Sequence, residues 1–122
     1  MKTKGTVSLE GIEFFARHGI YDFEREKGNT FWVDVFITKH YEENELNSLD
    51  DTIDYEKVYV TVAKVMQEPE NLLETVAHKI IIAITESTKG VENIKLKIKK
   101  NKPPIANSIM EYSAFELEWN KD

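Results

Sequence analysis

Lys100 is the side chain in this sequence best placed for acid–base chemistry. Residues 94–98 alternate apolar side chains with lysines, which is the period of a half-buried strand. Lys100 has the parity of the apolar residues, so we expect it to extend the inward face of that strand. Partial desolvation and the nearby charges of Lys99 and Lys102 would favour the neutral amine, which suits a general acid–base. A strand that ends earlier would leave Lys100 solvated, as most lysines are.

Glu74 has two possible roles. It lies three residues after Asn71 at the start of a predicted helix, the spacing of a capping box in which Asn71 is the N-cap. Its carboxylate could instead accept two hydrogen bonds from an amidine-like or guanidine-like edge of a ligand. The spacing by itself favours the capping role.

Two other side chains are weaker candidates. Tyr55 follows Asp54 at the start of another predicted helix, where a tyrosine usually packs with its hydroxyl satisfied. Glu24 lies in a charged loop, where the ordinary role is a solvated carboxylate. Loops held by a rigid hairpin are also where functional residues tend to lie.

Several other chemistries find no support in the pattern. The chain has no cysteine, which excludes disulfides and thiolate metal sites. His18, His40 and His78 lack the spacing of zinc ligands, so we predict no metal. There is no glycine-rich phosphate loop and no signature of a serine nucleophile.

The composition predicts one soluble domain over residues 1–122. Hydrophobic residues make up 41% and charged residues 31% of the chain. The net charge of -6 argues against nucleic-acid binding, which needs a basic surface. Acidic residues gather at 42–56 and basic ones at 95–102, which we interpret as two solvated surfaces. No segment resembles a signal peptide or a membrane span, so we expect a cytoplasmic protein with no membrane partner.

The hydrophobic pattern predicts two strands, two helices and two further strands. Gly11 interrupts the alternation of the first strand, which indicates a bulge. The predicted strands cover 7–14, 31–37, 94–98 and 109–119. The predicted helices begin near Asp54 and Asn71 and end near Pro69 and Gly90. The connections are a loop at 18–29, an acidic stretch at 42–51 and a break at 101–104.

This order predicts an α+β fold (ββααββ), a four-stranded antiparallel sheet with two helices on one face. Such a sheet leaves its edges and its second face uncovered. Trp32 and Phe36 fall on that second face, which indicates burial by something other than the two helices. Association of several subunits into a closed barrel would cover both.

Five segments in register resemble the dihydroneopterin aldolase family. They are FFARHG at 14–19, EREKG at 24–28, IDYEKV at 53–58, NLLE at 71–74 and KNKPPI at 100–105. The resemblance covers nearly the whole chain. It separates the family less well from its close relative, dihydroneopterin triphosphate epimerase.

The resemblance implies the tunnelling fold, in which subunits join their sheets into a barrel as a homo-tetramer or a stacked homo-octamer. Active sites would then lie between neighbouring subunits. In one subunit, Lys100 matches the catalytic lysine and Glu24 the loop glutamate near the substrate side chain. Glu74, beside the backbone of Leu73, matches the carboxylate that anchors the pterin ring.

From the adjacent subunit, Tyr55 matches the catalytic tyrosine, and Thr52 and Ile53 line the same pocket. Two departures bear on the pocket: residues 106–108 read Ala-Asn-Ser where the family often has a glycine, and residues 110–112 are larger than expected. Asparagine tolerates a positive φ better than most residues, so the turn can survive.

The resemblance implies a retro-aldol reaction that converts 7,8-dihydroneopterin into 6-hydroxymethyl-7,8-dihydropterin and glycolaldehyde, a step of folate biosynthesis. No cofactor is expected, because the ring carbon–nitrogen double bond beside the side chain can act as the electron sink once its nitrogen is protonated. The alternatives are an epimerase and a non-catalytic, oligomeric pterin-binding protein.

Overall fold

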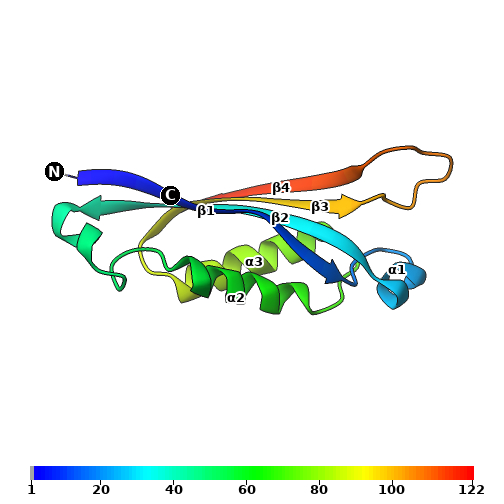
Figure 1. The fold of residues 1–122 in the computed structure, drawn as a ribbon, viewed down its shortest axis with the longest axis horizontal. Coiled ribbons are helices and arrows are strands. Elements are labelled where there is room, and N and C mark those ends of the chain that lie inside the picture. The colour runs from blue at the N-terminus through cyan, green and yellow to red at the C-terminus, as the bar shows by residue number, and fades with distance from the viewer. Residues whose placement is uncertain (1) are drawn as a thin grey trace.

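The computed structural model describes residues 2–122 as one antiparallel sheet with helices on one face (Figure 1). Its four strands lie in the order β1-β2-β3-β4, so the predicted ββααββ fold is confirmed. The strands are β1 (Lys2–Ala16), β2 (Asn29–Glu42), β3 (Val91–Asn101) and β4 (Tyr112–Asn120). The helices are α1 (Asp22–Lys27), α2 (Tyr55–Met66), α3 (Leu73–Ser87) and a 3₁₀ helix, η1 (Glu43–Asn47).

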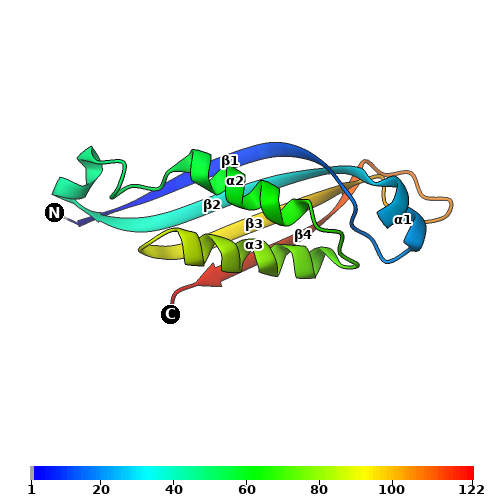
Figure 2. The same cartoon turned by 90° about the horizontal axis from the view of Figure 1, so that it is seen from below.

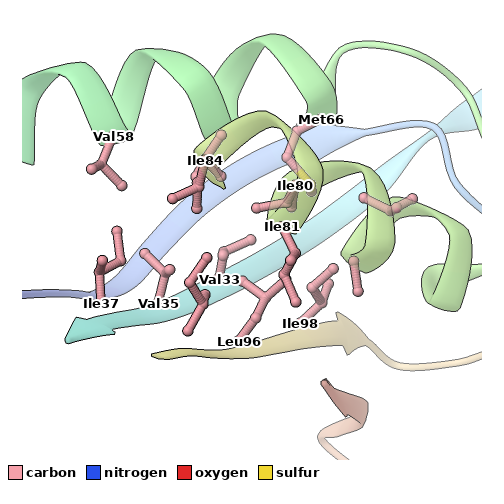
Figure 3. Packing of buried hydrophobic residues seen from close by; sticks show 14 of the residues in the cluster. Val33, Val35, Ile37, Val58, Met66, Ile80, Ile81, Ile84, Leu96 and Ile98 are labelled. Atoms are coloured by element: carbon pink, nitrogen blue, oxygen red, sulfur yellow. The ribbon is translucent and has the colours of Figure 1, made fainter. Parts of the chain in front are cut away.

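The two long helices cover one face of the sheet and leave the other open (Figures 1 and 2). α2 packs on β1 and on α3, and α3 packs on β3 and β4. The strand period of two and the helix period of 3.6 direct apolar residues into one layer between them (Figure 3). Among the residues of that layer are Val33, Val35, Ile37, Val58, Met66, Ile80, Ile84, Leu96 and Ile98. Fully burying each such side chain contributes roughly 1.5–3 kcal/mol.

The register of the sheet fixes where the site can form. β2 pairs with β3 so that Phe31 lies opposite Lys100 and Ile37 opposite Ile94. The predicted bulge in β1 is confirmed: the register shifts between Leu9 and Ile12, and Gly11 takes φ +70°. The predicted N-cap of the first helix is also confirmed, because the Asp54 carboxylate accepts the Glu56 N–H at 3.0 Å.

Some local details differ from the prediction. The expected loop at 18–29 contains the short helix α1, and the acidic stretch at 42–51 is a connection, as predicted, but includes the 3₁₀ helix η1. α3 begins at Leu73 with Leu72 as its N-cap and no side-chain cap, so the capping box of Asn71 and Glu74 does not form. The physical reason lies just upstream, where backbone pairing of Glu70 with His18 and Gly19 sets the path into α3.

The last strand begins at Tyr112, later than the predicted start near residue 109. Lys102 and Asn107 both have positive φ in the connection that precedes it, so the turn there does form around an asparagine. Within residues 2–122, no helix has the length and apolar character needed to span a membrane.

Candidate active site

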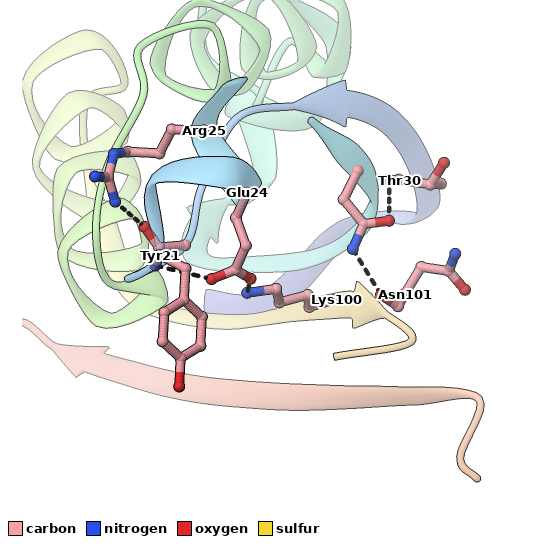
Figure 4. A network of polar contacts seen from close by, with 8 residues as sticks. Tyr21, Glu24, Arg25, Thr30, Lys100 and Asn101 are labelled. Carbon is pink, nitrogen blue, oxygen red and sulfur yellow. Dashed lines mark hydrogen bonds and ion pairs between the residues drawn. The ribbon is translucent and has the colours of Figure 1, made fainter. Parts of the chain in front are cut away.

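A buried ion pair between Lys100 and Glu24 forms the centre of the candidate site (Figure 4). The Lys100 Nζ donates to Glu24 Oε1, and the side chains are only 11% and 6% exposed. Lys100 therefore extends the inward face of β3, as its parity predicts, and the solvated alternative is wrong. The solvated interpretation of Glu24 is wrong too, because α1 turns this carboxylate inward.

The turn before α1 binds the second oxygen of the Glu24 carboxylate. The Tyr21 N–H donates to Glu24 Oε2 at 3.1 Å, and the Glu24 N–H donates to the Tyr21 carbonyl at 3.0 Å. Gly19 lies so close that a Cβ there would overlap the carboxyl group of Glu24. Arg25 donates to the Gly19 carbonyl and forms an ion pair with Asp22, which fixes the same turn.

The end of β3 is fixed from the other side by Asn29. Its Nδ2 donates to the Asn101 carbonyl at 2.6 Å, and its Oδ1 accepts the Thr30 N–H at 2.8 Å (Figure 4). Because Asn101 follows Lys100 directly, this contact keeps the lysine backbone in register. The amine and the carboxylate are thus positioned by backbone contacts on both elements.

The ion pair changes the expected chemistry of Lys100. The amine is paired directly with the Glu24 carboxylate, so it is engaged as a hydrogen-bond donor in an ion pair. Lys99, which was expected to act on Lys100, points to the open face of the sheet, where it lies 3.9 Å from Asp34 and packs against Tyr112. The arrangement therefore suits a lysine that donates a proton to a ligand atom.

Lys102 also belongs to the open face. Together with Trp32, Lys99 and Tyr112 it lines a hollow on that side, away from the inward amine of Lys100.

His18 lies buried beside the pair, which sequence reasoning missed. The residue is 1% exposed, and neither ring nitrogen has a hydrogen-bond partner among residues 2–122. Its ring meets the edge of Phe31 at 5.2 Å between centroids. Burial lowers the pKa of the imidazole from 6.5 to about 4; the Glu70 carboxylate and the Met66 carbonyl oppose this shift, and the Lys100 ammonium adds to it.

Glu74 and Leu73 lie in the first turn of α3, whose approach is tied to the Glu24 turn. His18 forms a backbone bridge with Glu70, and the Gly19 N–H donates to the Glu70 carbonyl at 2.9 Å. The Glu74 side chain is exposed and forms no hydrogen bond or ion pair in the described part of the chain. Its carboxylate is free to bind a ligand at this end of the sheet.

Tyr55 lies far along the sheet from Lys100. Val58, in the first turn of the helix that Tyr55 begins, lies over Ile37 (Figure 3), while Lys100 pairs with Phe31, six residues earlier on β2, which corresponds to about 20 Å of strand. Tyr55 is 60% exposed. One chain therefore does not bring the Tyr55 phenol to the Lys100 amine.

The two residues predicted to line the pocket with Tyr55 differ in exposure. Thr52 is half-buried and lines a hollow with Asp54 and Lys57. Ile53 is 4% exposed and packs in the core of its own chain, so its side chain does not line a pocket within that chain.

Known proteins match both this sequence and this fold. A family model described as FolB, dihydroneopterin aldolase, matches residues 7–118. The dihydroneopterin aldolase of Streptococcus pyogenes is 32% identical, covering 92% of this chain and 93% of that protein. A probable dihydroneopterin aldolase 3 of Arabidopsis thaliana is 32% identical, with 89% and 69% covered.

Solved structures show the same fold at low sequence identity. An E. coli dihydroneopterin aldolase structure superposes with a TM-score of 0.80 at 16% identity, covering 95% of this chain and 99% of that one. A putative dihydroneopterin aldolase from Vibrio cholerae gives a TM-score of 0.78 at 19% identity, with 96% and 98% covered.

The family match and the curated relatives together define a carbon–carbon lyase. The chain belongs to the dihydroneopterin aldolase family. The predicted function, an aldehyde lyase of folate biosynthesis, is confirmed by this membership.

Replacing His18 by leucine should change the pH dependence of stability. The pKa is 6.5 in the unfolded chain and about 4 in the folded one, so the unfolded chain binds the extra proton and wild type loses stability as pH falls through this window. The loss amounts to at most about 3 kcal/mol. The His18→Leu variant lacks this pH-dependent loss. The unfolding free energy of the variant minus that of wild type should therefore increase as the pH falls.

Urea unfolding of both proteins at about pH 7.5 and about pH 4.5 measures this difference. A difference that stays constant between the two pH values would show that the imidazole is not held neutral in the folded chain.

Proposed function

We propose that this chain cleaves 7,8-dihydroneopterin into 6-hydroxymethyl-7,8-dihydropterin and glycolaldehyde through the Lys100–Glu24 site. The observation that carries the proposal is the buried ion pair at the end of β3, in a chain that belongs to this family. A retro-aldol needs an acceptor for the electron pair of the broken bond. The ring carbon–nitrogen double bond of the substrate becomes that acceptor when its nitrogen is protonated.

Lys100 supplies that proton. Its ammonium is nearly buried, so a donated hydrogen bond is stronger there than in water. As the ring nitrogen gains the proton, the side-chain hydroxyl passes its own proton through water to the resulting Lys100 amine, the carbon–carbon bond breaks, and glycolaldehyde leaves. The electron pair passes into the ring and gives an enol-like intermediate. Glu24, already seated against Lys100, holds the glycol hydroxyls of the substrate.

Glu74 anchors the pterin edge, beside the backbone of Leu73. An exposed carboxylate with no partner among residues 2–122 can accept two parallel hydrogen bonds from an amidine-like edge. The solved E. coli relative is in complex with neopterin and one from Burkholderia thailendensis is bound to guanine. Both ligands carry a 2-amino-pyrimidinone edge, which supports a ligand of this class here.

Tyr55 of an adjacent subunit completes the site: its phenol gives a proton to the side-chain carbon of the intermediate, and the resulting phenolate takes the proton from the ring nitrogen. Its distance from Lys100 within one chain and its 60% exposure support a contribution across an interface. Thr52 borders the same pocket, and Ile53 contributes through its backbone because its side chain is buried. The free edges of β1 and β4 and the open sheet face support a ring of four subunits or a stack of two such rings.

Incubation with 7,8-dihydroneopterin tests the proposal directly. Chromatography should detect 6-hydroxymethyl-7,8-dihydropterin and glycolaldehyde in equal amounts. Recovery of only a side-chain stereoisomer would indicate the epimerase instead. Pterin binding without conversion, followed by fluorescence, would indicate a binding protein.

Substitutions at Lys100 and Glu74 should separate turnover from binding. Lys100→Gln keeps a donor for the Glu24 carboxylate but cannot deliver a proton, so kcat should fall roughly a hundredfold or more with little change in pterin affinity. Glu74→Gln should weaken pterin binding roughly 10- to 100-fold and affect kcat less. Steady-state kinetics and fluorescence titration give both quantities. Equal losses in kcat and affinity in both variants would contradict the division of roles.

Mixing two inactive variants should restore activity if the site spans two subunits. Lys100→Gln and Tyr55→Phe chains, unfolded together and refolded in equal amounts, would form rings in which about a quarter of sites have both native residues. Activity near that fraction of wild type is expected. The same variants refolded separately and then assayed together serve as the control, and activity no higher than in this control would exclude a shared site.

A further inference from the structure

The mechanism leaves one buried titratable group without a role, the imidazole of His18. It is 1% exposed, and both of its nitrogens lack partners in the part of the chain that the structure describes. A buried polar group without a hydrogen bond costs stability, and native proteins contain few of them. An apolar side chain of similar size would avoid that cost, so the histidine calls for an explanation beyond packing.

His18 is linked to each part of the Lys100 end of the site through one neighbouring residue. Its ring lies edge-on to Phe31, which is the cross-strand neighbour of Lys100. The next residue, Gly19, packs directly against the Glu24 carboxyl group. The backbone of His18 pairs with Glu70, four residues before Glu74. A shift of the ring would therefore change the positions of the Lys100 amine, the Glu24 carboxylate and the start of α3 together.

Burial has the largest effect on the charge of this ring, and it favours the neutral form. Among the charged groups around it, the Glu70 carboxylate, which is paired with Lys79, favours a proton on the ring, and the Lys100 ammonium on β3 disfavours one more weakly. The Met66 carbonyl at the end of α2 also favours the protonated ring, but its contact with the ring does not have hydrogen-bond geometry. Burial accordingly lowers the pKa of His18 to about 4, and Lys100 contributes to that shift.

We propose that His18 is a positioning residue, which keeps the Lys100–Glu24 pair in its working geometry as long as the imidazole is neutral. The charge states of His18 and Lys100 are then coupled, since a proton on one disfavours a proton on the other. The expected effect on catalysis rests on the proposed function. The coupling between the charges of His18 and Lys100 does not, and it can be measured without substrate.

The coupling is tested by following the His18 imidazole by NMR as the pH falls, with the His18→Gln variant to assign the signal. Lys100→Met removes the ammonium, so the titration midpoint of His18 should rise by at least about half a pH unit. Lys99→Met is the matched control, because it removes a charge one residue away on the opposite face and should leave the midpoint in place. Lys100→Gln serves the same purpose should the methionine variant not fold.

An unchanged midpoint in the folded Lys100 variants would overturn the proposal, as would an equal shift with Lys99→Met. Neither result involves substrate, so this arm stands even if the chain does not cleave dihydroneopterin.

The positioning role is tested with His18→Leu, which fills the site, and His18→Gln, which keeps a donor and an acceptor. For both we expect kcat to fall roughly tenfold while pterin affinity changes less than about threefold, with no loss of thermal stability in the leucine variant. A purely structural role predicts that kcat, affinity and stability fall together. That result, or a kcat within twofold of wild type in both variants, would overturn the proposal.

Discussion

The rest of the site depends on one buried ion pair, between Lys100 and Glu24. Removing two charges from water costs several kcal/mol per ion, and the attraction between them offsets this only when the geometry is good. The fold meets that condition by fixing both residues through their backbones: Asn29 holds the end of β3, and the Tyr21 N–H holds the second carboxylate oxygen. The glycine at position 19 is needed because any side chain there would displace Glu24.

The length of the strands divides the proposed site between chains. Lys100 pairs with Phe31 near one end of β2, whereas the first turn of α2, which begins at Tyr55, lies over Ile37, six residues further along that strand. A rigid sheet cannot fold back on itself to bring these two positions together, so the phenol must come from another subunit or take no part in the chemistry. The same geometry leaves β1 and β4 as free edges, which a neighbouring subunit can pair with.

The sequence predicts the parts of this structure that follow from periodicity. Alternation in 94–98 places Lys100 inward and Lys99 outward, and the glycine at position 11 marks the bulge. Periodicity cannot reveal α1, because six residues are too few to show a helical pattern and tertiary contacts hold the helix in place. The failed cap at Asn71 has a similar cause, since pairing of Glu70 with residues far away in sequence decides the helix start.

The burial of His18 could not be predicted for a related reason. His18 follows the end of β1, and residues far away in the sequence bury it: Glu70 pairs with its backbone and Phe31 packs against its ring. The partner of Lys100 could not be predicted from the sequence either. Parity gives the direction of a side chain but not the identity of the group it meets, and Glu24 is 76 residues away in sequence.

The open face of the sheet shows why closing the proposed ring is electrostatically acceptable. It carries Lys95, Lys97 and Lys99, which looks unfavourable for an enclosed surface. The register, however, sets Lys97 opposite both Asp34 and Glu116, and Lys95 opposite Glu118. Cross-strand pairs of opposite charge stabilise a sheet and leave this face nearly neutral. A barrel with this face inside would therefore enclose a polar, charge-balanced surface that water can fill, and would not have to bury a net positive charge.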